Sequence, residues 1–258
     1  MKDEIKSDYA VETRALVKSY YRGGVSFNAV DGIDLQVKPG EFVAIMGASG
    51  SGKSTALHLI AGLTRATSGD VYVEGERLSS LSDRALTIFR RRRLGVVFQS
   101  YNLIPHLTAE ENILFPLRAD GRKLDDSTRD KLRALARELE LEEQLSQYPD
   151  ALSGGQQQRV ALGRALIGEP AVILADEPTG NLDWTSSQRI CAIFDKLNRE
   201  EGRAIILVTH EPAVAIWSSR VVVLQDGRVV SDIPRAAYAD ASELAARYQE
   251  LARVGAER

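Results

Sequence analysis

The stretch that decides the fold is "EFVAIMGASGSGKST", residues 41–55. Residues 42–46 are apolar without alternation, which is typical of a strand buried on both faces. Residues 47–55 fit the pattern G-x-x-x-x-G-K-[ST], and the helix-forming run "STALHLIAGL" overlaps its end. A strand, a glycine loop and a helix in this order predict a phosphate-binding loop, or P-loop. The alternative is a glycine-rich surface turn with an exposed lysine, which the full pattern in this context disfavours.

Each residue type in the P-loop suits one part of a nucleoside triphosphate. Glycines allow the backbone N–H groups to turn toward phosphate oxygens. Lys53 would place a positive charge on the β- and γ-phosphates, the Ser54 hydroxyl would hold Mg²⁺, and Thr55 would reach a phosphate. The sequence therefore predicts a nucleoside triphosphate and Mg²⁺ as ligands, with a nucleotide site formed by Gly47, Ser49, Gly50, Gly52, Lys53, Ser54 and Thr55.

Three further apolar runs end in polar residues. "LGVVFQ" ends at Gln99, "AVILADE" at Asp176 and Glu177, and "AIILVTH" at His210. The carboxyl ends of parallel strands meet at one edge of a sheet, where ligands bind, so we expect these side chains to join the P-loop. A carboxylate at Asp176 suits Mg²⁺, and Glu177 suits the orientation of an attacking water.

Gln99 and His210 are weaker candidates when taken singly. The Gln99 amide oxygen could reach Mg²⁺ or the attacking water, and the His210 imidazole could donate to the γ-phosphate. Either side chain could instead satisfy local backbone groups. Their position at the ends of buried strands favours the functional interpretation, whereas His58 and His106 lack that position and are interpreted as structural.

The remaining segments predict two additions to the parallel sheet. The stretches 12–20, 32–41 and 70–78 alternate polar and apolar residues, as half-exposed antiparallel strands do, and 221–230 reads as a hairpin that turns at Asp226-Gly227. Within 102–154 an apolar helical stripe recurs, and another lies in the tail. The stripes consist of Leu132, Leu135, Ala136 and Leu139, and of Leu244, Tyr248 and Leu251.

We therefore predict an α/β P-loop NTPase with a parallel core sheet, an N-terminal antiparallel β subdomain and an inserted helical subdomain. The NTPase domain is expected over 10–235, with the helical subdomain at about 102–154 and a C-terminal helical extension over 236–258. The extension either packs back onto the core or makes a regulatory contact.

Composition excludes some classes of function. The 258 residues carry a formal net charge of −3, so the basic excess of a nucleic-acid binder is missing and no such partner is expected. No apolar run approaches the roughly 18 residues of a membrane span. The first ten residues contain no apolar signal-peptide core, and the single Cys191 cannot form an internal disulfide.

A second glycine loop occurs in "LSGGQQQRVALGRAL", residues 152–166. Ser153, Gly154 and Gly155 precede a helix whose first N–H groups are free to bind an anion. The plainer interpretation is that Ser153 only caps this helix. A phosphate site without a lysine of its own poses the question of which phosphate it serves.

The ordered motifs "GASGSGKST", "VVFQS", "LSGGQQQR", "ILADEP", "GNLD" and "LVTH" resemble the nucleotide-binding subunit of ATP-binding-cassette (ABC) transporters, over about residues 14–230. The resemblance implies an active ATPase in which two copies sandwich two ATP molecules head to tail. Each ATP would lie between the P-loop of one copy and Ser153, Gly154, Gly155 and Gln156 of the other.

The same resemblance implies roles for single residues. Tyr20 would stack on adenine, with Tyr21 as its rival, and Gln99 would sense Mg²⁺ and meet the membrane partner. Asp183 of "GNLD" would cross the dimer interface. Glu177 would be the general base and His210 the switch histidine, with Lys53 also in the catalytic set.

The segments "RRRRLGVVFQSYNLIPHLTAEEN" and "ILADEPTGNLD" resemble those of the macrolide-export, lipoprotein-release, cell-division and peptide-resistance branch of the family. That branch implies a separate few-span permease with a large extracytoplasmic domain, and a peripheral place on the cytoplasmic face of the plasma (inner) membrane. An amino-acid importer cassette or a regulator of a cell-envelope hydrolase remain alternatives. A soluble ABC ATPase acting on ribosomes or DNA is disfavoured, because the chain has one cassette and a short insertion.

The arginine run that precedes the apolar run "LGVVFQ" has two interpretations. The run Arg90–Arg93 is either a solvated helix face paired with acidic neighbours or a contact with anionic lipid or a partner helix.

Overall fold

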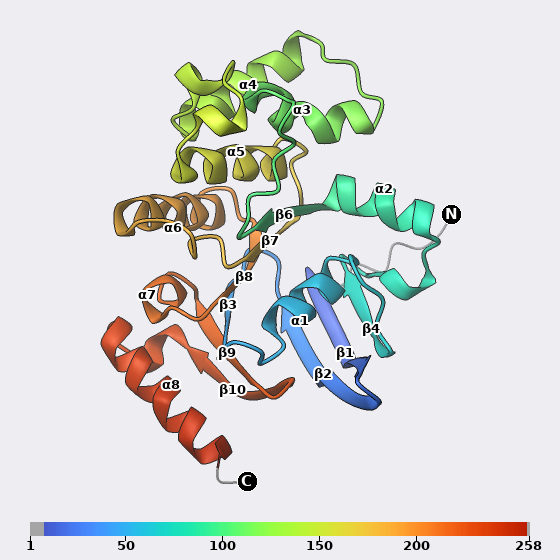
Figure 1. Ribbon diagram of the computed structural model, residues 1–258, viewed down its shortest axis with the longest axis vertical. Helices are drawn as coiled ribbons and strands as arrows, with labels where there is room; N and C mark the ends of the chain where they lie inside the picture. Colours follow the sequence, from blue (N-terminus) through green and yellow to red (C-terminus); the bar gives the residue numbers. More distant parts are fainter. Residues whose placement is uncertain (1–7, 257–258) are drawn as a thin grey trace.

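The computed structural model describes residues 8–256, and its centre is a six-stranded sheet in the order β10-β9-β3-β8-β7-β6 (Figure 1). All neighbours pair in parallel except the β9–β10 hairpin, whose turn residues Asp226 and Gly227 both have positive φ. Strands β3 and β8 are buried along their whole length, as the unbroken apolar runs predict. The parallel core and the hairpin are thus confirmed. The strands are β3 (Phe42–Met46), β6 (Leu94–Phe98), β7 (Val172–Asp176), β8 (Ala204–Thr209), β9 (Arg220–Gln225) and β10 (Arg228–Pro234).

A second, antiparallel sheet has the order β2-β1-β4-β5. Its strands are β1 (Val11–Arg22), β2 (Val25–Val37), β4 (Ser68–Val73) and β5 (Glu76–Arg77). Helix α1 (Lys53–Ile60) joins the two sheets, because its residues Leu57 and Ile60 lie in one apolar cluster with Val30 of β2 and Leu174 of β7. The helix that follows the P-loop is therefore held from both sides.

Helices cover the opposite face of the parallel sheet. Phe194 packs on Phe42 with ring centroids 6.5 Å apart, and Ile113 and Leu139 belong to the same apolar cluster. Within the residues that the structure describes, no helix has the length and apolar content of a membrane span. The helices on this face are α3 (Ala109–Ala119), α4 (Asp126–Glu138), α5 (Gly154–Leu166), α6 (Trp184–Arg199) and α7 (Pro212–Ala215). Helix α2 (Asp83–Arg93) packs on the other side, since its Leu86 belongs to the cluster of α1. Short 3-10 turns lie at 78–80, 142–144, 149–151 and 235–237.

Helices α3 and α4 lie together at the upper end of the molecule in Figure 1, inside the segment 102–154. On α4 the predicted stripe faces the core, since Leu132 and Ala136 are buried and Leu135 is partly buried. The limits proposed for the ATPase domain and its helical subdomain stay predictions.

The tail forms helix α8 (Ala241–Ala256), and residues 257–258 of the predicted extension lie outside the described residues. Leu244 is fully buried, and Tyr248 and Leu251 pack on a cluster that includes Met46 and Val223. In Figure 1 this helix lies beside α7 and β9. The apolar stripe of the tail therefore packs back onto the core, next to the strand that leads into the P-loop.

The arginine run at the end of α2 is paired with acidic groups. The Arg91 and Arg92 side chains both contact the Asp120 carboxylate, at 3.3 and 3.0 Å, and Arg93 lies 3.4 Å from Glu74. Asp120 follows α3, so these contacts tie α2 to the helical segment. The arginine run is therefore paired with acidic neighbours, as expected for a solvated helix face.

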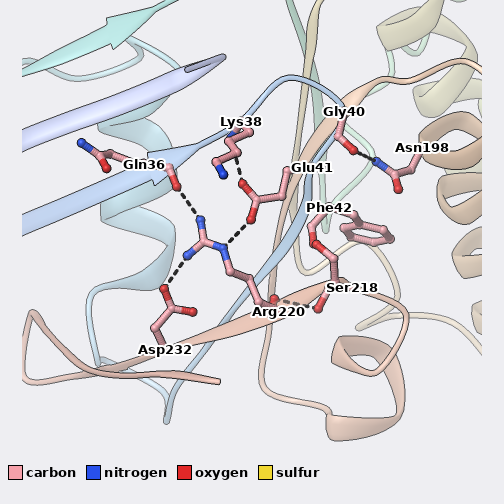
Figure 2. A network of polar contacts seen from close by, with 10 residues as sticks. Gln36, Lys38, Gly40, Glu41, Phe42, Asn198, Ser218, Arg220 and Asp232 are labelled. Carbon is pink, nitrogen blue, oxygen red and sulfur yellow. Dashed lines mark hydrogen bonds and ion pairs between the residues drawn. The ribbon is translucent and has the colours of Figure 1, made fainter. Parts of the chain in front are cut away.

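A buried arginine ties the parallel sheet to the antiparallel one (Figure 2). The Arg220 guanidinium of β9 donates to Glu41 Oε1 at 2.5 Å, to Asp232 Oδ2 at 2.6 Å and to the Gln36 carbonyl. Its side chain is only 16% exposed. Glu41 directly precedes β3, so the network fixes the start of the strand that ends in the P-loop.

Candidate functional site

The P-loop is closely packed and requires glycine at two positions. A Cβ on Gly47 would lie 2.3 Å from Ser51 Oγ and 2.4 Å from the Leu224 carbonyl oxygen. Gly52 has φ +100°, and a Cβ there would lie 2.1 Å from the Ala29 carbonyl oxygen. Gly52 is also the N-cap of α1 and supplies no side-chain cap. The N–H groups of this helix end are therefore available to an anion.

Lys53 begins α1 and lies across its own loop. The side chain is 5% exposed, and Nζ donates to the carbonyl oxygens of Gly47 and Ala48, both at 2.9 Å. Burial lowers the pKa of Lys53, while the nearby carboxylates of Glu177 and Asp176 act to raise it. The structure thus concentrates one cation and two carboxylates at the mouth of the loop.

Polar groups at the ends of β7 and β8 meet the start of α1. Asp176 Oδ1 accepts a hydrogen bond from Ser54 Oγ at 2.8 Å. Glu177 Oε2 lies 3.2 Å from His210 Nδ1. The pairing of β7 with β8 aligns Asp176 with Val208, which places the two strand ends side by side. The strand ends therefore bring together Ser54, Asp176, Glu177 and His210, as the pattern of apolar runs predicts.

Glu177 has an unusual backbone. Its φ is +43°, in the left-handed region that side chains other than glycine rarely adopt. The Glu177 N–H donates to the Val208 carbonyl at 3.0 Å, and the Gly180 N–H donates to the Glu177 carbonyl at 3.1 Å. Strained conformations of this kind persist where the surroundings fix them, often at functional sites. These backbone hydrogen bonds therefore fix the direction in which the Glu177 side chain leaves the chain.

Ser54 and Asp176 offer oxygen donors that suit Mg²⁺. This ion binds through one or two carboxylates, together with waters and phosphate oxygens, and does not need a full cage of side chains. A hydroxyl and a carboxylate 2.8 Å apart beside a phosphate loop fit that requirement. Gln99 at the end of β6 is exposed and lies against Gly180, where a Cβ would be 2.8 Å from its Nε2. It makes no hydrogen bond to Ser54 or Asp176 in the described chain.

The second glycine loop forms the N-terminus of α5. Ser153 Oγ accepts from the Gln156 N–H at 3.3 Å, and the Gln156 side chain accepts from the Ser153 N–H at 2.8 Å. This capping box shows that Ser153 caps α5. The hydroxyl only accepts here, so its proton remains free to donate to an anion. Across residues 8–256, no hydrogen bond or ion pair joins 153–156 to 47–55.

Asp183 caps α6 beside this loop. Its carboxylate accepts from Ser186 N at 2.9 Å and from Ser186 Oγ at 2.7 Å. The Ser186 side-chain hydrogen bond is the main cause that lowers the pKa of Asp183. A Cβ on Gly155 would lie 3.0 Å from Ser186 Oγ, so the two helix N-termini are in contact. Trp184, the first residue of α6, is 65% exposed on this surface.

The aromatic residues proposed for adenine lie on β1. Tyr20 is 40% exposed and packs against Phe27 with ring centroids 6.0 Å apart, while Tyr21 is 76% exposed. Phe27 belongs to β2, as does Ala29, whose carbonyl lies against Gly52 of the P-loop. Phe27 therefore lies on the strand that flanks the phosphate loop, and Tyr20 packs against it from the neighbouring strand.

Sequence reasoning missed two residues of this site. His58 was expected to be structural, but its Nε2 lies 3.4 Å from Asp176 Oδ2. A spacing of four from Ser54 on the same helix is the signal that could have indicated this contact. Gln158 of α5 is fully buried and donates to the Pro178 carbonyl at 2.6 Å, directly after Glu177. It links the second glycine loop to the Glu177 turn.

Comparisons with known proteins agree with this geometry. Residues 30–180 match the family model described as ABC transporter. A macrolide export ATP-binding/permease protein MacB of Syntrophobacter fumaroxidans is 43% identical over 232 residues, which cover 87% of this chain and 32% of that protein. The lipoprotein-releasing system ATP-binding protein LolD 1 of Caulobacter vibrioides is 43% identical over 223 residues, covering 86% of this chain and 95% of the relative.

Solved structures give the same result. A dimeric structure of a post-hydrolysis state of the ATP-binding cassette MJ0796, bound to ADP and Pi, superposes with a TM-score of 0.82 and 41% sequence identity. The match covers 87% of this chain and 98% of that chain. MJ0796 is a protein of Methanocaldococcus jannaschii. The chain therefore belongs to the ABC transporter family, as one of its ATP-hydrolysing cassettes.

Proposed function

We propose that the chain is the nucleotide-binding subunit of a membrane transporter, which closes as a dimer on Mg-ATP and opens after hydrolysis. The observation that carries the proposal is the meeting of Lys53, the Ser54–Asp176 pair and the Glu177–His210 pair at one edge of the sheet. A cation for phosphate, an oxygen pair for a metal and a carboxylate for water are the groups that ATP hydrolysis needs.

The residue roles follow from these positions. The P-loop N–H groups and Lys53 bind the phosphates, and Tyr20 stacks on the adenine. Ser54 and Asp176 would hold Mg²⁺. Gln99 would join them, since it follows Phe98, which pairs in register with Asp176. When bound, the ion supplies positive charge to the β- and γ-phosphates. Glu177 orients the attacking water and accepts its proton. His210 holds one Glu177 oxygen and donates to the γ-phosphate.

A second copy of the chain completes each site. Among the described residues, the loop of Ser153 to Gln156 makes no hydrogen bond or ion pair with the P-loop of its own chain, which supports a phosphate held by another copy. The related cassette MJ0796 was solved as a dimer, which supports this arrangement. Asp183 and the exposed Trp184 lie beside the loop and would be covered when the dimer closes.

The partner in the membrane is an integral permease. The relatives are named for macrolide export and lipoprotein release, which favours a few-span permease with a large extracytoplasmic domain. The chain would then work peripherally on the cytoplasmic face of the plasma (inner) membrane, with no nucleic-acid partner. Closure of the dimer would transmit force to that permease, whether the permease extrudes a molecule or activates a cell-envelope hydrolase.

The test has two parts. Purified protein should release phosphate from ATP only with Mg²⁺ present, and Glu177→Gln should abolish this release. The Glu177→Gln protein, tagged and extracted from membranes in gentle detergent with ATP, should co-purify with a permease. Absence of Mg-dependent hydrolysis above the Glu177→Gln control, even with the permease present, would refute the enzymatic proposal. Recovery of ribosomes or DNA in place of a permease would refute the transporter proposal.

A further inference from the structure

A histidine outside the recognised motifs faces the carboxylate that is proposed to hold the metal. His58 lies on α1, one helical turn after Ser54, so the two side chains project from the same face. Ser54 Oγ donates to Asp176 Oδ1 at 2.8 Å, and His58 Nε2 lies 3.4 Å from Asp176 Oδ2. Two side chains on one face of α1 therefore lie against the two oxygens of the Asp176 carboxylate.

Asp176 provides the one polar contact that the structure gives to His58 Nε2 among the described residues. The side chain as a whole is 37% exposed, but Nε2 itself is buried and has no hydrogen-bond partner among the described residues. The imidazole ring lies beside Phe98, with ring centroids 6.3 Å apart. Phe98 pairs in register with Asp176 across β6 and β7, so the same pair of strands positions the ring and the carboxylate.

A buried polar nitrogen without a hydrogen-bond partner costs free energy, and a hydrogen bond from Nε2 to the neighbouring Asp176 carboxylate would offset that cost. The 3.4 Å separation is only a few tenths of an ångström beyond a normal N–H···O hydrogen bond. Such contacts at unliganded sites often tighten when the ligand binds. The required form is the imidazole with its proton on Nε2, donating to Oδ2 while Oδ1 stays directed toward Ser54.

We infer that His58 is a positioning residue, which orients the Asp176 carboxylate for Mg²⁺ by holding the oxygen that Ser54 does not. This inference rests on the proposed function, because it concerns the metal of the Mg-ATP site. Groups that hydrogen-bond a metal ligand fix its orientation, and their removal commonly weakens metal affinity or activity about 10- to 100-fold. Loss of His58 should therefore act through metal affinity and not through the chemical step.

Three substitutions separate positioning from packing. In His58→Gln the amide nitrogen reaches as far from the backbone as Nε2 does. In His58→Asn the amide nitrogen falls one bond short. His58→Leu keeps the bulk and removes the donor. The matched control is His106→Leu, because His106 is exposed in the loop before α3.

The first readout is binding without turnover. In the Glu177→Gln background, fluorescence of mant-ATP is followed against free Mg²⁺ concentration. We expect His58→Leu and His58→Asn to need about tenfold more Mg²⁺ for half-maximal binding, and His58→Gln to stay within about threefold of the parent. His106→Leu should match the parent. With Glu177 intact, the Mg²⁺ concentration for half-maximal ATPase should rise by a similar factor, whereas kcat at saturating Mg²⁺ should change less than about twofold.

The inference is wrong if His58→Leu and His58→Asn bind metal-nucleotide like His106→Leu, or if His58→Gln is no better than His58→Leu. Should His58→Leu not fold, the comparison of Gln with Asn decides, since both are polar and differ in where the nitrogen lies. If the parent protein itself shows no Mg²⁺-dependent mant-ATP binding, the proposed function fails, which is a different result.

Discussion

Arg220 provides the sharpest test of how the two sheets are held together. The change Arg220→Met keeps most of the side-chain length and removes the guanidinium. Glu41 is 20% exposed and would lose its cation while keeping the Lys38 N–H at 2.8 Å. Asp232 is 50% exposed, so its contact with Arg220 contributes little.

The magnitude follows from these exposures. Hydrogen bonds to charged groups contribute about 1.5–3 kcal/mol, and a buried acceptor left without a donor costs about 1–3 kcal/mol. The Gln36 carbonyl belongs to an exposed residue and regains water, so the loss comes mainly from the Glu41 contact. The free energy of unfolding should fall by about 2 kcal/mol. For a chain of this size such a loss corresponds to a Tm lower by about 4–8 °C.

Thermal and urea unfolding followed by circular dichroism would measure this change. The control is Arg228→Met, because the Arg228 side chain is 70% exposed and pairs with Asp31 across the surface. The control should lose at most about 1 kcal/mol. If Arg220→Met loses no more than Arg228→Met, the reasoning about this buried network is refuted.

Three further predictions concern other parts of the molecule. Burial raises the pKa of the Cys191 thiol to about 12, so it should not react with a disulfide reagent at pH 8 until urea unfolds the chain; reaction in the folded state would contradict its buried position. The lowered pKa of Asp183 means that its cap stabilises α6 above the ordinary carboxyl pKa of about 4 and loses that contribution as pH falls through the lower folded value. Asp183→Asn should therefore flatten the acid limb of a stability–pH curve, and an unchanged limb would disprove the assignment. Gln158→Leu should lower kcat about tenfold with mant-ATP binding retained, because Pro178 next to Glu177 loses its buried donor; an unchanged kcat would show that the Glu177 turn holds itself.

Much of the fold could be predicted because the core strands leave a plain pattern. Strands β3 and β8 are buried on both faces and read as unbroken apolar runs, whereas β2 alternates because one face is exposed. The same logic predicts that polar residues at the ends of β7 and β8 meet, since parallel strands end at one edge. Glu177 and His210 lie 3.2 Å apart for that reason.

Contacts made across the sheet could not be predicted in this way. The spacing of His58 from Ser54 places both residues on one face of α1, but His58 meets Asp176 only because α1 packs on β7. The Arg91 and Arg92 contacts with Asp120 similarly depend on how α2 is placed against the end of α3. A charge run has the same appearance in sequence whether its partners are intramolecular or not, so only the fold distinguishes the two interpretations.

The central claim is that two copies close around Mg-ATP, and sedimentation of the Glu177→Gln protein tests it most directly. With saturating Mg-ATP the protein should sediment as a dimer, and without nucleotide as a monomer. Addition of Lys53→Ala should abolish the dimer, because the phosphates lose their buried cation. A Glu177→Gln protein that remains monomeric with saturating Mg-ATP, even beside its permease, would contradict the account.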